Sequence, residues 1–157
     1  MSKPAGMDGQ VRLRRACSAD IPAMSAIRLS VRENVLSDPA RVTLQMYEDY
    51  LDRDGRGWVA EIDGEIAGFS YADRRDASIW ALFVSPRHEG RGLGKALLAL
   101  AVTWLFELGH GRVRLGTTPG TRADRFYAAL GWSRMQGDGR EVDYVLDKHP
   151  QMARRTS

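Results

Sequence analysis

Alternating and helically spaced apolar residues predict that strands and helices are mixed along this chain. Alternation predicts a first strand at residues 11–14. Apolar residues at helical spacing predict a helix from about 20 to 31, capped by Ser18 and with Pro22 in its first turn, where a missing N–H costs nothing. A second helix is expected from Thr43 to about Leu51.

The middle of the chain predicts a hairpin, a buried strand and a long helix. Asp63-Gly64 is a strong signal for a two-residue hairpin turn. The mostly apolar run from Ser78 to Val84 predicts a strand buried on both faces, and residues 91–108 predict a central packed helix that Gly109 ends. Other expected elements are strands at 57–62, 65–71, 112–117 and on either side of 137–139, and a helix around Phe126-Tyr127.

A glycine-rich loop between the strand and the long helix is the most informative segment. Glycines at alternate positions leave the turn without side chains, so successive amides can point at one anion, and the helix N-terminus adds partial positive charge. The loop therefore predicts a phosphate site, although a tight turn with incidental arginines has the same pattern. Its glycines are Gly90, Gly92 and Gly94, and the nearby cations are Arg87, Arg91 and Lys95.

The spacing of this loop excludes two common nucleotide-binding motifs. In the frame of a nucleotide-triphosphate loop, Glu89 stands where the first glycine belongs and Ala96 where the magnesium-binding hydroxyl belongs. The dinucleotide fingerprint fails because its third glycine falls on Lys95 or Leu97. What remains is Gly-x-Gly-x-Gly after a strand.

Two segments in order resemble the GNAT superfamily of acyl-CoA-dependent N-acyltransferases. Residues 89–94 fit its pyrophosphate loop, Gln/Arg-x-x-Gly-x-Gly/Ala, with Glu89 in place of Gln or Arg. Residues 121–132 are similar to its segment Asn-x-Arg-Ala-x-x-Phe-Tyr-x-x-x-Gly-Phe, with Gly120 near the usual Asn and Trp132 in place of the last Phe. The chain is therefore identified as a member of that superfamily.

The resemblance implies an α/β (α+β) GNAT fold in a single domain at 10–148, with 1–9 and 149–157 as loose tails. The expected order is β-α-α-β-β-β-α-β-α-β-β, in one mixed, mostly antiparallel sheet of about six to seven strands flanked by helices. In this fold the strands corresponding to Ala77–Val84 and Arg112–Thr117 splay apart, and the pantetheine arm of the cofactor enters the gap.

The activity that the resemblance implies is transfer of an acetyl group from acetyl-CoA to a primary amine of a small molecule or protein. The amine attacks the thioester directly, so no protein nucleophile is needed. Tyr127 matches the family residue that protonates the departing thiolate, and a main-chain N–H near Phe83 is implied to stabilise the oxyanion. The residues implied to bind the cofactor are Leu82, Phe83, Val84, Glu89, Gly90, Arg91, Gly92, Leu93, Gly94, Lys95, Arg122 and Phe126.

The general base does not follow from the resemblance. In many relatives a glutamate begins the strand before the glycine loop, whereas Ser78 stands there in this chain. Glu33, Asp73 and Asp76 are the nearest acidic candidates, and a water relay is the preferred reading.

The acceptor pocket is expected to include Trp58, Tyr71 and Trp80, although aromatic residues on strands more often belong to the core. Residues 26–50 are expected to choose the acceptor, but they contain no recognisable ligand code. A non-catalytic acyl-CoA-binding or interaction module is the alternative function, because Ser78, Glu89 and Gly120 depart from the family pattern.

Composition and charge exclude several other classes. A length of 157 residues with 43% apolar content predicts one domain, and no run reaches the roughly 18 apolar residues of a membrane span. A cytoplasmic protein is therefore expected, without nucleic-acid or membrane partners and with a homodimer left open. Cys17 is expected to be packing, and three scattered histidines predict no metal site. The basic second half of the chain fits an anionic cofactor.

Overall fold

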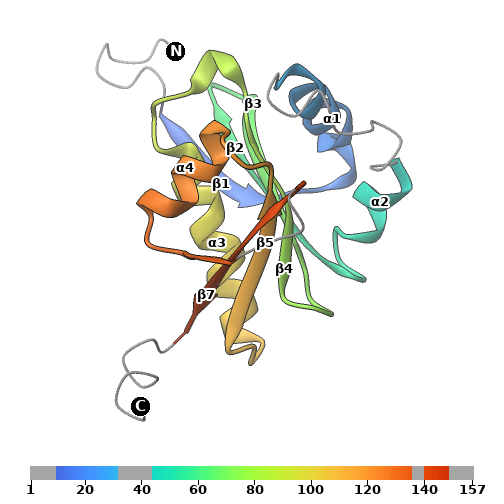
Figure 1. The fold of residues 1–157 in the computed structure, drawn as a ribbon. Helices are drawn as coiled ribbons and strands as arrows, with labels where there is room; N and C mark the ends of the chain where they lie inside the picture. The colour runs from blue at the N-terminus through green and yellow to red at the C-terminus, as the bar shows by residue number, and fades with distance from the viewer. Residues whose placement is uncertain (1–9, 32–43, 136–139, 149–157) are drawn as a thin grey trace, which may run out of the picture.

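One mixed sheet with helices on both faces forms the molecule (Figure 1). The computed structural model describes residues 10–31, 44–135 and 140–148. Its strands are β1 (Val11–Arg15), β2 (Gly55–Ile62), β3 (Glu65–Asp73), β4 (Ser78–Val84), β5 (Arg112–Thr117), β6 (Ser133–Met135) and β7 (Val142–Asp147). Its α-helices are α1 (Ile21–Ser30), α2 (Leu44–Asp49), α3 (Leu93–Glu107) and α4 (Arg122–Ala129). This is the predicted order of elements, with two short 3₁₀ turns added at Ser18–Asp20 and Pro86–His88.

The strands lie in the order β1-β2-β3-β4-β5-β7-β6. All neighbouring pairs are antiparallel except β4 and β5, which are parallel. Asp63 and Gly64 join β2 to β3 with φ angles of 53° and 82°, the left-handed values that a type I′ hairpin turn requires. The predicted hairpin is thus confirmed.

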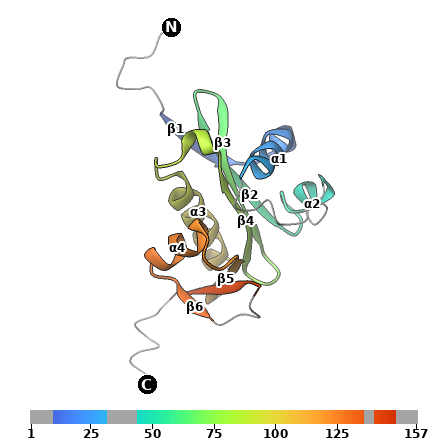
Figure 2. The ribbon, with the colours of Figure 1, turned by 45° about the horizontal axis from the view of Figure 1, so that its top comes forward.

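Two hydrophobic layers hold the sheet between the helices. Helices α1 and α2 cover one face, where Met24, Tyr47 and Phe69 are buried together, and α3 and α4 cover the other (Figure 2). Helix α3 is buried on one side only, because Lys95, Ala99, Thr103 and Glu107 form an exposed or partly exposed stripe at i, i+4 spacing. The expected central helix is therefore present, but it is packed on one side and exposed on the other.

The start of α1 also differs from the prediction. Cys17, not Ser18, caps the turn that leads into the helix, and the Asp20 carboxylate accepts its backbone N–H at 2.9 Å. Arg14 donates two further hydrogen bonds to the same carboxylate, each 2.8 Å long. Ser18 instead donates from its hydroxyl to Glu48. Cys17 is exposed rather than packed, because it lies in this surface turn.

An irregularity in β4 shapes the centre of the sheet. Tyr71 pairs with Ala81 and Ala72 pairs with Ile79, so Trp80 is an extra residue, a β-bulge. Beyond the bulge, Phe83 packs toward α1 and α2, while Leu82 and Val84 pack toward α3. Bulges are common beside functional sites, because they change the direction in which side chains point.

The sheet is split between β4 and β5. Their register contains a single pair, Ser78 with Arg114, supported by the hydrogen bond from the Arg114 N–H to the Ala77 carbonyl at 3.0 Å. Residues 82–84 are only half-buried as a result, which corrects the prediction that Ser78–Val84 is buried on both faces. Side chains that border an open gap have fewer neighbours than those inside a continuous sheet.

Candidate active site

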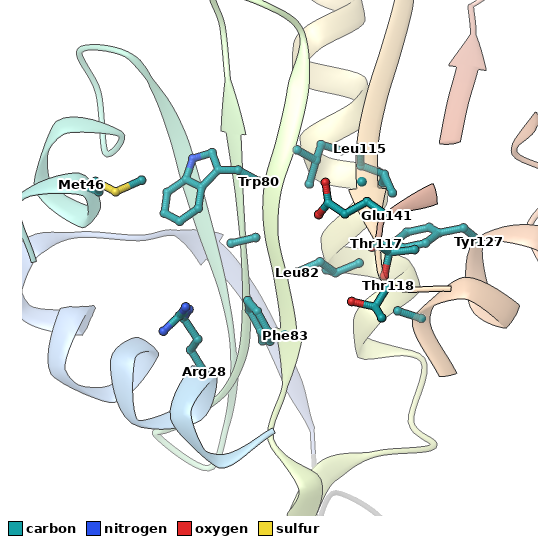
Figure 3. A pocket seen from close by; sticks show the side chains of 14 residues that line it. Arg28, Met46, Trp80, Leu82, Phe83, Leu115, Thr117, Thr118, Tyr127 and Glu141 are labelled. Carbon is teal, nitrogen blue, oxygen red and sulfur yellow. The ribbon is translucent and has the colours of Figure 1, made fainter. Parts of the chain in front are cut away.

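A cavity of about 270 Å³ fills the gap between β4 and β5 (Figure 3). The two strands form facing walls, and helices from both faces of the sheet complete it. The cavity is therefore lined both from the face that α1 and α2 cover and from the face that α4 covers. The lining residues are 79–83, 115–118, Arg28, Met46, Ala123, Tyr127 and Glu141.

The backbone of β4 presents unpaired groups to this cavity. The Ser85 N–H donates to the Ala67 carbonyl at 2.8 Å, so Ser85 directs its backbone polar groups toward β3. Successive residues of a strand direct these groups to opposite edges, which places the N–H and C=O groups of Leu82 and Val84 on the β5 side. No β5 residue pairs with them, because the register between the strands ends at Ser78. The groups at Leu82 and Val84 can therefore hydrogen-bond to a ligand as an added strand would.

The glycine loop lies directly after β4 and has an open backbone. Gly90 and Gly92 have φ angles of +81° and +78°, which favour glycine, and Gly92 is the N-cap of α3. A Cβ atom added to either glycine would meet nothing within 4 Å. At Gly94 a Cβ atom would lie 3.6 Å from Phe126 and 3.7 Å from Val84. The structure thus brings the loop, the end of β4 and α4 together at one place.

Two of the basic side chains around this loop are paired with carboxylates. Arg87 lies 3.0 Å from Glu65, and Arg122 lies 2.6 Å from Glu89. Within the described part of the chain, no salt bridge forms at Arg91 or Lys95. The loop therefore keeps two cations beside an open backbone, an arrangement suited to a phosphate or diphosphate.

Tyr127 lies on the wall of the cavity, where α4 faces the gap (Figure 3). Helix α4 begins at Thr121, whose hydroxyl accepts the Asp124 N–H at 3.2 Å. Burial raises the pKa of the Tyr127 hydroxyl above its usual value, so the group is protonated at neutral pH. It makes no hydrogen bond to any residue that the structure describes, whereas the Tyr144 hydroxyl beside it donates to Asp124 at 2.6 Å. Tyr127 therefore has a proton available for a ligand.

The acidic residues expected near the reaction lie elsewhere or outside the described residues. Asp73 accepts hydrogen bonds from Arg75, and Asp76 accepts one from the Ser78 hydroxyl at 2.5 Å. Both aspartates are at the closed end of the gap and neither lines the cavity. Glu33 lies outside the described residues.

Among the described residues, Glu141 is the carboxylate that lines the cavity, and the sequence pattern did not predict it. Its Oε1 atom lies 3.2 Å from the position of a Cβ atom on Gly116, so the missing side chain there makes room for it. Gly116 pairs with Asp143 across β5 and β7, which brings the start of β7 beside β5. An isolated glycine in a predicted strand signals the close approach of another group, and it was the available clue.

Of the three aromatic residues expected in the acceptor pocket, only Trp80 lines the cavity. Trp58 is buried on the face of the sheet that α3 covers, where the centre of its ring lies 5.7 Å from that of Trp104. Tyr71 is fully buried and donates its hydroxyl to the Tyr47 carbonyl at 3.1 Å. Both belong to the core, so their predicted pocket role is wrong.

Among the described residues, no group of three or more His, Cys, Asp or Glu side chains is arranged to hold a metal ion. None of the helices seen in the described ranges has the length and apolar character needed to cross a membrane.

Known proteins share this sequence pattern and architecture. A family model described as "Acetyltransferase (GNAT) family" matches residues 22–132. Mycothiol acetyltransferase from Actinosynnema mirum is 34% identical over 111 residues, which are 67% of this chain and 36% of that protein. This chain thus spans about a third of that relative's length.

Solved structures show the fold. The PaiA N-acetyltransferase from Thermoplasma acidophilum, in complex with coenzyme A, has a TM-score of 0.76 at 15% identity, covering 88% of this chain and 99% of that one. Ribosomal-protein-alanine N-acetyltransferase from Brucella melitensis has a TM-score of 0.70 at 22% identity, covering 87% and 99%. The predicted fold class is confirmed by these likenesses.

Proposed function

Since this chain belongs to the acetyltransferase (GNAT) family, we propose that it transfers an acetyl group from acetyl-CoA to a primary amine. One observation carries the proposal: the gap between β4 and β5 has an open glycine loop beyond one end of β4 and the Tyr127 hydroxyl on its wall. A cofactor arm in this gap brings its thioester beside a protonated phenol. The acceptor is an amine on a small molecule or peptide, and the reaction takes place in the cytoplasm.

The residues around the loop fit acetyl-CoA. The backbone at Gly90 and Gly92 is open where a Cβ atom would otherwise stand, so amide groups can reach the pyrophosphate. Arg91 and Lys95 add positive charge there. Backbone groups of Leu82 and Val84 are placed to hydrogen-bond to the pantetheine amides or to stabilise the developing oxyanion.

Acetyl transfer requires one proton to leave the amine and one to reach the thiolate. The amine nitrogen bonds to the acetyl carbonyl carbon, and the carbon–sulfur bond breaks. Tyr127 gives its hydroxyl proton to the departing sulfur, and Glu141 accepts the proton that the amine loses. Bulk solvent then restores both groups to their starting states. Ser78 takes no part, because its hydroxyl is bonded to Asp76 outside the cavity.

Release of free thiol from acetyl-CoA in the presence of a panel of primary amines tests this function. We expect amine-dependent thiol release together with an acetylated product detected by mass spectrometry. A non-catalytic module would instead saturate with acetyl-CoA in calorimetry and release no thiol with any amine. Gel filtration of the same preparation checks the homodimer, which stays a prediction.

A further inference from the structure

The cavity has one positive and one negative side chain among its described lining residues. Arg28 comes from the last turn of α1, and Glu141 stands just before β7. Figure 3 shows them on opposite walls, with Arg28 on the side of α1 and Glu141 beside β5. The other lining side chains are neutral.

Arg28 lines the cavity and has no carboxylate partner among the described residues. Arg14 and Arg75, by contrast, pair with Asp20 and Asp73 at 2.8 Å and 3.1 Å. The Arg28 side chain is half-buried and extends from α1 toward Trp80 (Figure 3). A half-buried guanidinium at the wall of a cavity is suited to bind an anion from the ligand, and its planar fork fits a carboxylate.

On the Arg28 side the lining side chains are mostly apolar, whereas Thr117, Thr118 and Tyr127 add hydroxyl groups on the other side. Met46, Trp80 and Phe83 lie on the same side as Arg28 and leave little for a polar ligand body to bond with. The volume of about 270 Å³ lies just below the usual range for small-molecule pockets and must also hold the acetyl group and the end of the cofactor arm. These dimensions suit a compact acceptor with an apolar side chain.

We propose that the acceptor is a free amino acid with an apolar side chain, held by Arg28 through its carboxylate. This inference rests on the proposed acetyl transfer. Arg28 would then set specificity without taking part in the chemistry. Its loss is expected to weaken binding of the carboxylate and leave the transfer step almost unchanged.

Three acceptors with the same isobutyl group on the amine-bearing carbon test the proposal: L-leucine, L-leucinamide and isopentylamine. They share the amine and the apolar body and differ in the carboxylate. We expect kcat/KM, compared per unprotonated amine, to be at least about 10-fold higher for leucine than for the other two.

Variants of Arg28 separate a specificity role from a structural one. Arg28→Gln is expected to raise KM for leucine by about 10- to 100-fold while kcat, and all values for the other two amines, change little. Arg28→Lys should raise KM for leucine less than Arg28→Gln does, because lysine keeps the positive charge but not the planar guanidinium group. Arg12→Gln, which removes an exposed charge on β1, is the matched control and should have no effect.

Two results would overturn the assignment. One is a wild-type preference for leucinamide or isopentylamine, and the other is an equal loss with all three acceptors in Arg28→Gln. Calorimetry of leucine with the CoA-loaded protein gives a readout independent of turnover. If leucine binds in an Arg28-dependent way but is not acetylated, the proposed enzyme activity is contradicted and the leucine site is supported. If amines are acetylated but leucine does not bind, the leucine site is contradicted and the enzyme activity is supported.

Discussion

The guanidinium of Arg122 and the carboxylate of Glu89 form an ion pair, with Nη1 and Oε2 only 2.6 Å apart, where α4 begins beside the glycine loop. Sequence similarity implies that both residues contact the cofactor. Glu89, which stands where the family has Gln or Arg, therefore pairs with a cation that we propose as a contact of the cofactor diphosphate. Binding of an anion must compete with this internal carboxylate.

Glu89→Gln is therefore expected to strengthen binding of acetyl-CoA. Both side chains are substantially exposed, at 66% and 41%, so solvent screens the effect and we expect a gain of about 3- to 10-fold in affinity. Calorimetry at low and high salt measures it, and the gain should shrink as salt rises. Arg122→Gln should weaken binding instead. An affinity that falls in Glu89→Gln would show that the carboxylate assists the cofactor.

Substitution of Gly92 tests the phosphate loop. Gly92 and Gly109 flank α3, both with positive φ and open space at the Cβ position. An alanine at either position therefore costs about 1–2 kcal/mol of unfolding free energy from backbone strain alone. Only Gly92→Ala should also weaken acetyl-CoA binding, by about 10-fold or more, because its methyl group stands where pyrophosphate approaches. Equal affinities for both folded variants would rule out this loop as the site.

Tyr127→Phe tests the general acid. It keeps the ring but removes the proton, so single-turnover transfer should slow by about 10²- to 10⁴-fold while acetyl-CoA affinity stays within a few fold. Tyr144→Phe is the control, since it removes a neighbouring hydroxyl that donates to Asp124, and it should lower thermal stability rather than rate. A Tyr127→Phe enzyme with wild-type single-turnover rates would exclude the role.

The pH dependence gives a separate test of Tyr127. A general acid must be protonated, so its contribution is lost as pH rises through its pKa. Burial raises the pKa of Tyr127 above its usual value, about 10 for an exposed tyrosine. Tyr127 should therefore cause no alkaline fall in rate below about pH 10. A Tyr127-dependent fall near neutral pH would contradict this assignment.

Glu141→Gln tests the base. The variant cannot accept a proton, so kcat/KM should drop by about 10²-fold or more, and the acidic limb of the pH–rate profile should disappear. Ser78→Ala is the matched control, because Ser78 occupies the position of the family glutamate yet lies outside the cavity; its profile should change only modestly. An acidic limb that persists in Glu141→Gln would favour a water relay.

Asp20 is expected to make stability depend on pH. Hydrogen bonds from Arg14, together with the Cys17 N–H, hold the pKa of Asp20 below its usual value despite the cost of burial. The stabilisation is fully present above about pH 4–5, where the unfolded carboxyl is also ionised, and is lost as pH falls through the folded pKa. Asp20→Asn should lower unfolding free energy by about 1–3 kcal/mol at pH 7, and the difference from wild type should diminish in acid. Urea titrations at pH 7 and pH 3 measure both effects.

Local signals predicted most of the fold but only part of the site. The hairpin turn at Asp63-Gly64, the glycine loop and the order of elements depend on neighbouring residues, so the sequence shows them directly. Glu141 depends on the pairing of Gly116 with Asp143, a contact between distant segments that no local pattern specifies. The error at Trp58 has a similar cause: β2 is largely buried, so alternation does not reveal which face meets the cavity.

The split between β4 and β5 has a mechanical consequence. Beyond the pair Ser78 and Arg114 the two strands share no ladder hydrogen bonds, so widening or narrowing the mouth breaks none. Helix α3 packs against β2, β3 and β4 on one side of the split and against β5 on the other. The helix therefore connects the two parts of the sheet. Backbone hydrogen bonds fix the closed end of the gap, at Ser78 and Arg114. The width of the open end depends instead on side-chain packing beneath α3. Small changes in that packing can therefore adjust the width of the opening without altering the fold.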